Sequence, residues 1–155
     1  MPWLATARRW QDALGWFDRA IAGEDTIGHI FLNRGDCHRS LGVIAEALTD
    51  FERAAELFAG DEKAQWAIQS RIALVHNERG TQLYNHAAAR HAAVEFSRAI
   101  ECNPRVAHFY INRAQATLEL KRYELARDDL LAALKLNPNN ERAQRMLAQL
   151  SPGEN

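Results

Sequence analysis

The sequence predicts an all-α fold, a solenoid of about eight helices stacked as antiparallel pairs. Three observations support this fold class. Small and large side chains recur at a fixed period, they share one face of a helix, and turn-forming residues separate them. The fixed period is the strongest of the three, because periods of about 20 to 50 residues are typical of repeat architectures.

Three columns of apolar side chains repeat four times along the chain, and all three keep the same register. The members are Ala13, Ala47, Ala92 and Ala126; Phe17, Phe51, Phe96 and Leu130; and Ala20, Ala54, Ala99 and Ala133. Within each copy they fall at i, i+4 and i+7, which is one face of a helix. Alanine lets a neighbouring helix approach, and the larger side chain fills the gap beside it.

A fourth column supplies the small residues of the alternate helix. Its members are Gly35, Gly80, Ala114 and Ala148. The expected unit is therefore two antiparallel helices with a close crossing where small residues meet. The Asn-Pro pairs at 103–104 and 137–138 should end one helix before the next begins, and Asp61 and Asn140 are expected N-caps.

These patterns place the helices near 6–22, 27–41, 44–58, 61–84, 87–101, 105–120, 123–136 and 140–150. The second step along each of the first three columns is a 45-residue step, which exceeds the 34-residue period by eleven residues. Eleven residues at about 100° each make roughly three full turns, so a helix can lengthen without rotating its buried face. We expect an extended helix pair here, with Trp66, Ile68 and Ile72 partly outside the core.

With these motifs the chain resembles the tetratricopeptide-repeat (TPR) family. Residues 109–138 carry the family pattern most fully, at Tyr110, Ala114, Tyr123, Ala126, Leu130, Ala133 and Pro138. The resemblance extends over nearly the whole chain and implies a single right-handed TPR solenoid domain. We divide it into a half repeat (1–26), three repeats (27–60, 61–104 and 105–138, the second with the insertion), and a capping helix and tail (139–155).

Composition excludes several function classes. The formal net charge is −1, so no global field attracts nucleic acid or an anionic membrane. Cys37 and Cys102 lie too far apart for a zinc motif. His86 and His91 lack the spacing of two ligands on one helix face. We expect no catalytic residue, metal or cofactor, and, without a secretory signal or an apolar stretch of about 18 residues, a cytoplasmic location.

The resemblance implies a non-catalytic adaptor that binds a protein or an extended peptide on the concave face, lined by the first helix of each repeat. Carried over by alignment, the expected site residues are His29, Asn33, Asp36, Arg39, Asn77, Thr81, Tyr84, Asn85, His108, Asn112, Gln115, Glu119 and Arg142. Amide groups suit hydrogen bonding to peptide backbone. The alternative is that these are simply solvated positions. The family's two-carboxylate clamp matches outright only at Asn112, so we expect it to be absent.

Two alternatives remain open. The first is a structural element that uses open solenoid ends and the extended 61–84 helix for oligomerisation or packing within a larger parent chain; Trp3, Trp10 and Trp16 favour it, because aromatic residues dominate contact energetics. The second concerns the recurring arginines Arg34, Arg79 and Arg113. They could form a ladder for an acidic ligand, but we favour stems on the inter-repeat seam with charged heads in water.

Overall fold

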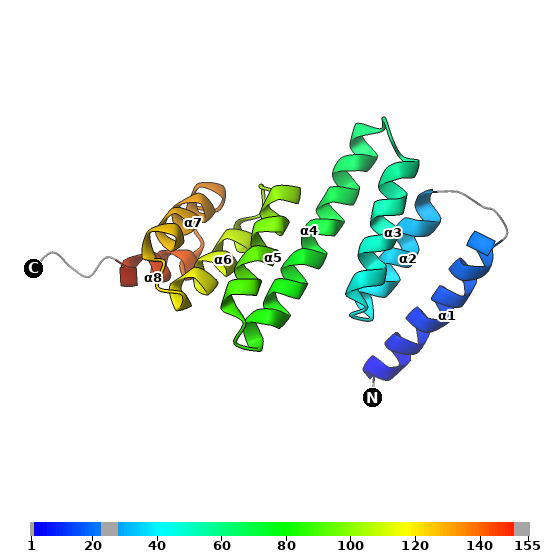
Figure 1. Ribbon diagram of the computed structural model, residues 1–155, viewed down its shortest axis with the longest axis horizontal. Coiled ribbons are helices and arrows are strands. Elements are labelled where there is room, and N and C mark those ends of the chain that lie inside the picture. Colours follow the sequence, from blue (N-terminus) through cyan, green and yellow to red (C-terminus); the bar gives the residue numbers. More distant parts are fainter. Residues whose placement is uncertain (1, 23–27, 151–155) are drawn as a thin grey trace, which may run out of the picture. The chain divides into compact units, whose positions relative to one another are not determined.

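The computed structural model describes residues 2–22 and 28–150, and the side chains of residues 8–22 and 28–150. Eight helices, and no strand, make up this part of the chain (Figure 1). They are α1 (Pro2–Ala22), α2 (Gly28–Ser40), α3 (Ile44–Leu57), α4 (Glu62–Asn85), α5 (Ala89–Cys102), α6 (Ala107–Glu119), α7 (Tyr123–Leu136) and α8 (Glu141–Leu150). The predicted all-α class and the helix order are confirmed, with boundaries within a few residues.

The helices form two compact units, Met1–Val75 and His76–Asn155. In the first unit α1 packs on α2 and α2 on α3; in the second α5 packs on α6, α6 on α7 and α7 on α8. Helix α4 contributes its first part to one unit and its last part to the other. No helix among the described residues is long and apolar enough to cross a membrane.

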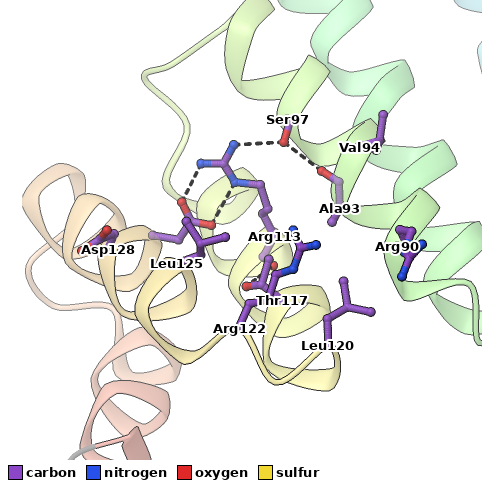
Figure 2. A pocket seen from close by; sticks show the side chains of 11 residues that line it. Arg90, Ala93, Val94, Ser97, Arg113, Thr117, Leu120, Arg122, Leu125 and Asp128 are labelled. Atoms are coloured by element: carbon purple, nitrogen blue, oxygen red, sulfur yellow. Dashed lines mark hydrogen bonds and ion pairs between the residues drawn. The ribbon is translucent and has the colours of Figure 1, made fainter.

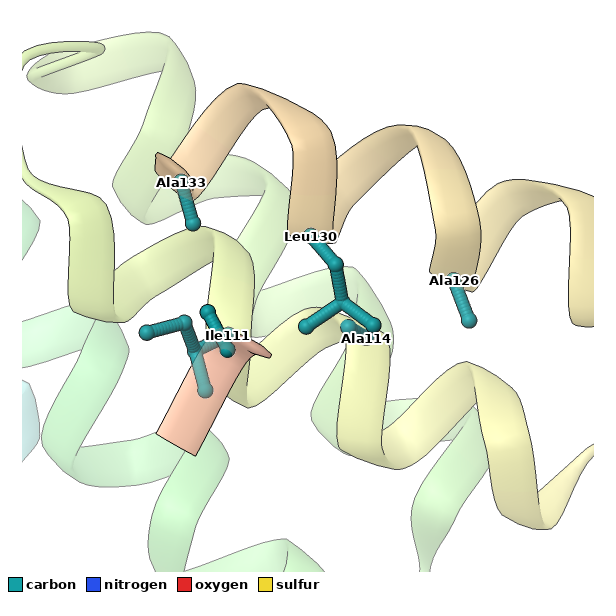
Figure 3. Close-up of a cluster of buried hydrophobic side chains, with 6 residues drawn as sticks. Ile111, Ala114, Ala126, Leu130 and Ala133 are labelled. Atoms are coloured by element: carbon teal, nitrogen blue, oxygen red, sulfur yellow. The ribbon is translucent and has the colours of Figure 1, made fainter. Parts of the chain in front are cut away.

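The core of each unit is built from the repeated stripe of small and large residues. Ala47, Phe51 and Ala54 on α3 are fully buried, and the corresponding residues of α5 and α7 are buried to the same degree. Figure 3 shows the α7 copy, where Leu130 lies against α6 close to Ala114. Burial of one such large side chain contributes about 1.5–3 kcal/mol, so the stripe explains why these helices associate.

Close helix crossings occur where the sequence predicts them. A Cβ atom on Gly35 would lie 2.7 Å from Cε1 of Phe51, and one on Gly80 would lie 2.6 Å from Cε1 of Phe96. Such distances are far inside van der Waals contact, so only glycine lets the phenylalanine ring rest on the facing helix. The small column is therefore a packing requirement at both positions.

The helix ends also follow the sequence signals. The backbone N–H of Ala64 donates to Oδ1 of Asp61 at 2.9 Å, and that of Ala143 donates to Oδ1 of Asn140 at 3.0 Å. Both predicted N-caps are thus confirmed. Each side chain satisfies one of the backbone donors that a helix leaves unpaired in its first turn.

Two expectations about burial are wrong. Ile68 is fully buried and Ile72 nearly so, although Trp66 is 44% exposed as expected. Because the insertion adds close to a whole number of turns, the apolar face of α4 stays in register and remains covered. The added length falls in α4, which has 24 residues, whereas α3 keeps 14.

The fourth member of the small column also behaves differently. Ala148 on α8 is exposed, whereas Gly35, Gly80 and Ala114 are buried. The stripe of α1 (Ala13, Phe17 and Ala20) is likewise only half-buried. The physical reason is the same at both helices. In the complete pairs, the small column of the first helix and the stripe of the second helix bury each other. Among the described helices, α1 has no first helix to pair with and α8 has no second helix.

Candidate functional site

Polar side chains from α4, α6 and α8 surround a hollow of about 260 Å³ in the second unit. We call it the amide hollow; its lining residues are Thr81, Tyr84, Asn85, Phe96, Asn112, Gln115 and Arg142. All except Phe96 were predicted from the sequence as site residues. Three helices far apart in sequence therefore bring their polar positions to one place.

Hydrogen bonds connect these three helices. Nδ2 of Asn112 donates to Oδ1 of Asn77 at 2.9 Å, which joins α6 to α4. The guanidinium of Arg142 on α8 donates to the side-chain oxygen of Gln115 on α6. An amide has two N–H donors and a carbonyl acceptor, so each of these bonds uses only part of its capacity. The remaining groups can serve a ligand.

Tyr84 is tied to Glu119 at the edge of the amide hollow. Its hydroxyl donates to the Glu119 carboxylate, which connects α4 to the end of α6. Burial raises the pKa of Tyr84, and the hydrogen bond to Glu119 adds to that rise. The phenol is therefore protonated throughout the neutral range and acts as a hydrogen-bond donor.

A second hollow of about 450 Å³ adjoins the first. We call it the flanking hollow; its lining residues are Gln115, Leu118, Arg142, Arg145, Met146 and Gln149. Gln115 and Arg142 line both hollows and so form the wall between them. Leu118 was not predicted, although its position three residues after Gln115 places it on the same face of α6. The flanking hollow thus adds two apolar side chains, Leu118 and Met146, and a second cation, Arg145, to the groups of the amide hollow.

The four predicted residues of the first unit converge only in part. Oδ2 of Asp36 accepts from Nε of Arg71 at 3.0 Å, and Nε of Arg39 lies 4.0 Å from Oδ1 of the same carboxylate. His29 instead contacts the ring of Phe58 edge-on at 4.9 Å, and Asn33 is exposed. Sequence reasoning missed Arg71, because its position in the extended part of α4 has no counterpart in the other repeats.

His108 lies outside both hollows. Its ring contacts Phe109 in a T-shaped arrangement with centroids 4.5 Å apart. Partial burial lowers the pKa of His108, which keeps the imidazole neutral at pH 7. Of the predicted residues on α6, only Asn112 and Gln115 line the amide hollow.

The arginine column has a role that both sequence interpretations missed. Nε and Nη2 of Arg113 donate to the two carboxylate oxygens of Asp129 at 2.9 and 2.6 Å, and Nη1 donates to Ser97 at 3.0 Å (Figure 2). Arg34 binds buried Asp50 in the same bidentate manner. The expectation of solvated heads is therefore wrong for these two arginines. The missed signal was a column of acids sixteen residues after each arginine.

Arg113 also lines a third hollow, of about 400 Å³, between α5, α6 and α7. In Figure 2 the exposed side chains of Val94 and Leu125 stand on opposite sides of it, on α5 and α7. Sequence reasoning did not predict this hollow, because its walls are the second helices of the repeats.

The described residues hold no group of three or more His, Cys, Asp or Glu side chains placed to bind a metal ion. Cys37 is buried, and burial raises its pKa, with Asp36 adding to the rise. Burial also raises the pKa of Cys102. Both thiols are therefore protonated and weakly nucleophilic at neutral pH.

Comparisons with known proteins agree with this architecture. The sequence profile of the tetratricopeptide repeat matches residues 107–140. The chain is 31% identical over 144 residues to tetratricopeptide repeat protein 16 of Macaca fascicularis, a match that covers 93% of this chain and 16% of that protein. This chain therefore spans only a small part of that relative's length.

Solved structures resemble the fold at lower sequence identity. MamA superposes with a TM-score of 0.59 at 14% identity, covering 95% of this chain and 80% of the other. The second TPR domain of the human RPAP3 protein, in complex with the HSP70 peptide SGPTIEEVD, superposes with a TM-score of 0.54 at 18% identity, covering 81% of this chain and 99% of that one. These structures show that the chain shares their fold. The matching repeat profile, the similarity to tetratricopeptide repeat protein 16 and the regular repeat period support the assignment of the chain to the tetratricopeptide-repeat family.

Proposed function

We propose that this chain is a protein-interaction module that binds an extended peptide segment across the amide hollow and the flanking hollow. The observation that carries this proposal is the convergence of six polar side chains, predicted separately along the sequence, on one hollow formed by α4, α6 and α8. The similarity to a TPR domain in complex with a peptide supports the same role.

The chemistry of the two hollows favours peptide backbone over a compact small molecule. Asn112 and Gln115 offer paired donors and acceptors, which match the alternating N–H and C=O groups of an extended chain. Arg142 and Arg145 add positive charge beside Leu118 and Met146. The preferred segment therefore carries one or more acidic side chains next to an apolar one.

This preference differs from a clamp for a terminal carboxylate. Such a clamp needs several cations around one desolvated carboxylate, because an isolated buried charge is costly. In the amide hollow Arg142 is the cation, and Gln115 already accepts one of its hydrogen bonds. We therefore propose that binding depends on internal peptide sequence and not on a free C-terminus.

The test is a display of random twelve-residue peptides, selected for binding to the intact 155-residue chain. Selected peptides are then titrated against the wild type and against the double variant Asn112→Ala/Gln115→Ala. We expect the variant to bind at least about tenfold more weakly, because two hydrogen-bonding side chains at the hollow are lost. Amidating the peptide's C-terminus should leave binding unchanged.

A matched control is the double variant Val94→Ala/Leu125→Ala, which alters the third hollow and leaves the amide hollow intact. It should bind like the wild type. The proposal is wrong if no peptide binds the chain at micromolar concentration. It is also wrong if the two double variants weaken binding equally while retaining wild-type thermal stability.

A further inference from the structure

Trp16 is the most exposed large apolar side chain among the described residues, with 67% of its surface in contact with solvent. Arg19 stacks on its ring at 4.4 Å. Large exposed aromatic residues are enriched where a protein contacts a partner. The place of Trp16 in the repeat is a second reason to expect a partner at this surface.

Trp16 occupies a column that is acidic in every other copy. Its counterparts, each one place before the large residue of the buried stripe, are Asp50, Glu95 and Asp129. Each of those carboxylates is buried and lies near the arginine of its own helix pair: Asp50 with Arg34 at 2.6 Å, Glu95 with Arg79 at 3.9 Å, and Asp129 with Arg113 at 2.6 Å. The acidic column thus belongs to an ion pair between the two helices of each repeat, and α1 lacks its acid.

The arginine column changes in the complementary way at the other end of the chain. Its members, each one place before the small residue of the first helix, are Arg34, Arg79, Arg113 and finally Leu147 on α8. Leu147 is half-buried against the core of α6 and α7. Among the described helices, α1 and α8 have no pair partner, and each carries an apolar residue at its position of the ion pair.

A third position completes the match. In two of the three complete repeats the arginine also contacts a polar residue sixteen positions earlier, Asp18 for Arg34 and Ser97 for Arg113. The equivalent position before Leu147 is Leu131, which is 50% exposed on α7. At α7 and α8 two leucines, Leu131 and Leu147, thus replace the polar residues of the interior repeats. A helix that packs on this surface should carry an apolar side chain where the interior repeats have a carboxylate.

We propose that a second copy of this chain covers this surface, with its α1 packed on α8 of the first copy as the missing second helix of the pair. Trp16 of one copy then lies on Leu131 and Leu147 of the other. The half-buried stripe of α1 (Ala13, Phe17 and Ala20) meets the exposed Ala148. Each half repeat completes the other. This assembly is independent of peptide binding at the amide hollow.

The contact is heterologous, because it joins two different surfaces. Copies linked in this way form an open chain or, if the rotation closes, a ring. An isologous dimer, in which α1 pairs with α1, would use one surface twice. The two modes respond differently to variants at the two ends, and this difference provides the test.

Sedimentation velocity of the intact chain, from low micromolar to several hundred micromolar, should show a sedimentation coefficient that rises with concentration. Trp16→Asp and Leu147→Arg should each weaken self-association at least about tenfold, since each places a charge in an apolar contact. An equimolar mixture of the two variants should associate more strongly than either variant alone. In that mixture one intact α8 surface meets one intact α1 surface, and the introduced carboxylate meets the introduced guanidinium.

The double variant Trp16→Asp/Leu147→Arg should recover self-association, because it recreates between copies the ion pair of the interior repeats. Matched controls are Trp66→Asp and Leu125→Arg, which change exposed residues of the same types elsewhere. Both should associate like the wild type, and far-ultraviolet circular dichroism should show unchanged helix content in every variant.

Three outcomes would overturn the proposal. The first is a wild-type chain that stays monomeric over the whole concentration range. The second is a Leu147→Arg variant that dimerises as well as the wild type, which would indicate an α1-to-α1 contact. The third is a mixture of the two single variants that remains monomeric although the wild type associates.

Discussion

Each complete helix pair of this protein contains a buried carboxylate, Asp50, Glu95 or Asp129. Asp50 and Asp129 are only 1% and 5% exposed, and each accepts hydrogen bonds from both Nε and Nη2 of one guanidinium. Asp50 also lies 2.9 Å from Nδ1 of His38. A buried carboxylate is tolerated only when it is paired and hydrogen-bonded. Neutralising it leaves the partly buried arginine beside it without a countercharge, and this destabilises the fold.

The neighbouring residues Asp128 and Asp129 allow this to be measured. Asp129→Asn should lower the free energy of unfolding by about 2–3 kcal/mol, because Arg113 loses its charged partner and remains half-buried. Asp128→Asn, on the exposed side of α7, should change it by less than about 0.5 kcal/mol. Urea unfolding monitored by circular dichroism compares the two variants. Equal effects would contradict the proposed importance of the ion pair.

Gly80 tests the close crossing between α4 and α5. A leucine at this position would collide with Phe96, and overpacking of this kind costs about 1–3 kcal/mol. The change also gains about 1 kcal/mol of helix propensity, so the net loss is smaller than the steric term. Gln82→Leu, an exposed position on the same helix, is the control and should not destabilise. Thermal unfolding of both variants is the measurement, and a Gly80→Leu variant more stable than the wild type would contradict the close crossing.

At the scale of elements, the turns inside the helix pairs share one backbone conformation. Gly42, Ala87 and Lys121 all have positive φ, at 75°, 57° and 58°. All three stand at the same place in their repeats, five positions before the first alanine of the buried stripe. The left-handed region disfavours side chains other than glycine. The repeat therefore imposes a turn geometry that two of its three copies adopt at an energetic cost.

Substitutions at these turns should have opposite effects. Ala87→Gly should stabilise the chain by about 0.5–1 kcal/mol because it relieves the strain, and Gly42→Ala should destabilise it by about 1 kcal/mol because it introduces that strain. Ala88→Gly is the control, since Ala88 has φ of −101° and gains nothing from glycine. The measurement is the urea midpoint of each variant. Stabilisation by Ala88→Gly equal to that by Ala87→Gly would contradict the explanation.

The sequence predicted the helices well because their signals are local. The small-large-small stripe fixes the buried face of α3, α5 and α7, and the caps at Asp61 and Asn140 fix two helix starts. Six residues of the amide hollow could be predicted for the same reason. They lie on the first helices, outside the buried small column, and repetition brings the same side of successive first helices together.

What the sequence did not predict depends on relations between helices. The pairing of Arg113 with Asp129 requires the relative register of two antiparallel helices, which local periodicity does not specify. The burial of Ile68 and Ile72 depends on which surface the lengthened α4 meets. The third hollow depends on the spacing between α5 and α7. Each is a consequence of tertiary packing.

At the scale of the whole molecule, each compact unit has its own buried stripe and its own ion pairs. In repeat proteins a repeat contacts mainly its neighbours, so stability is close to a sum of local terms and nearest-neighbour interfaces. The second unit contains the last part of α4 together with α5 through α8. Its internal contacts include Gly80 with Phe96, and His76 with Glu95 at 2.8 Å.

The last prediction is therefore that residues 76–155 fold without the rest of the chain. Urea should unfold this fragment in one cooperative transition, with a lower m-value than the intact chain because less surface becomes exposed. The control fragment, 86–155, lacks the part of α4 that covers Phe96 and should lose most of its stability. If the 76–155 fragment showed helical circular dichroism but no cooperative transition, its packing would depend on the first unit, and the additive description of the repeats would be wrong.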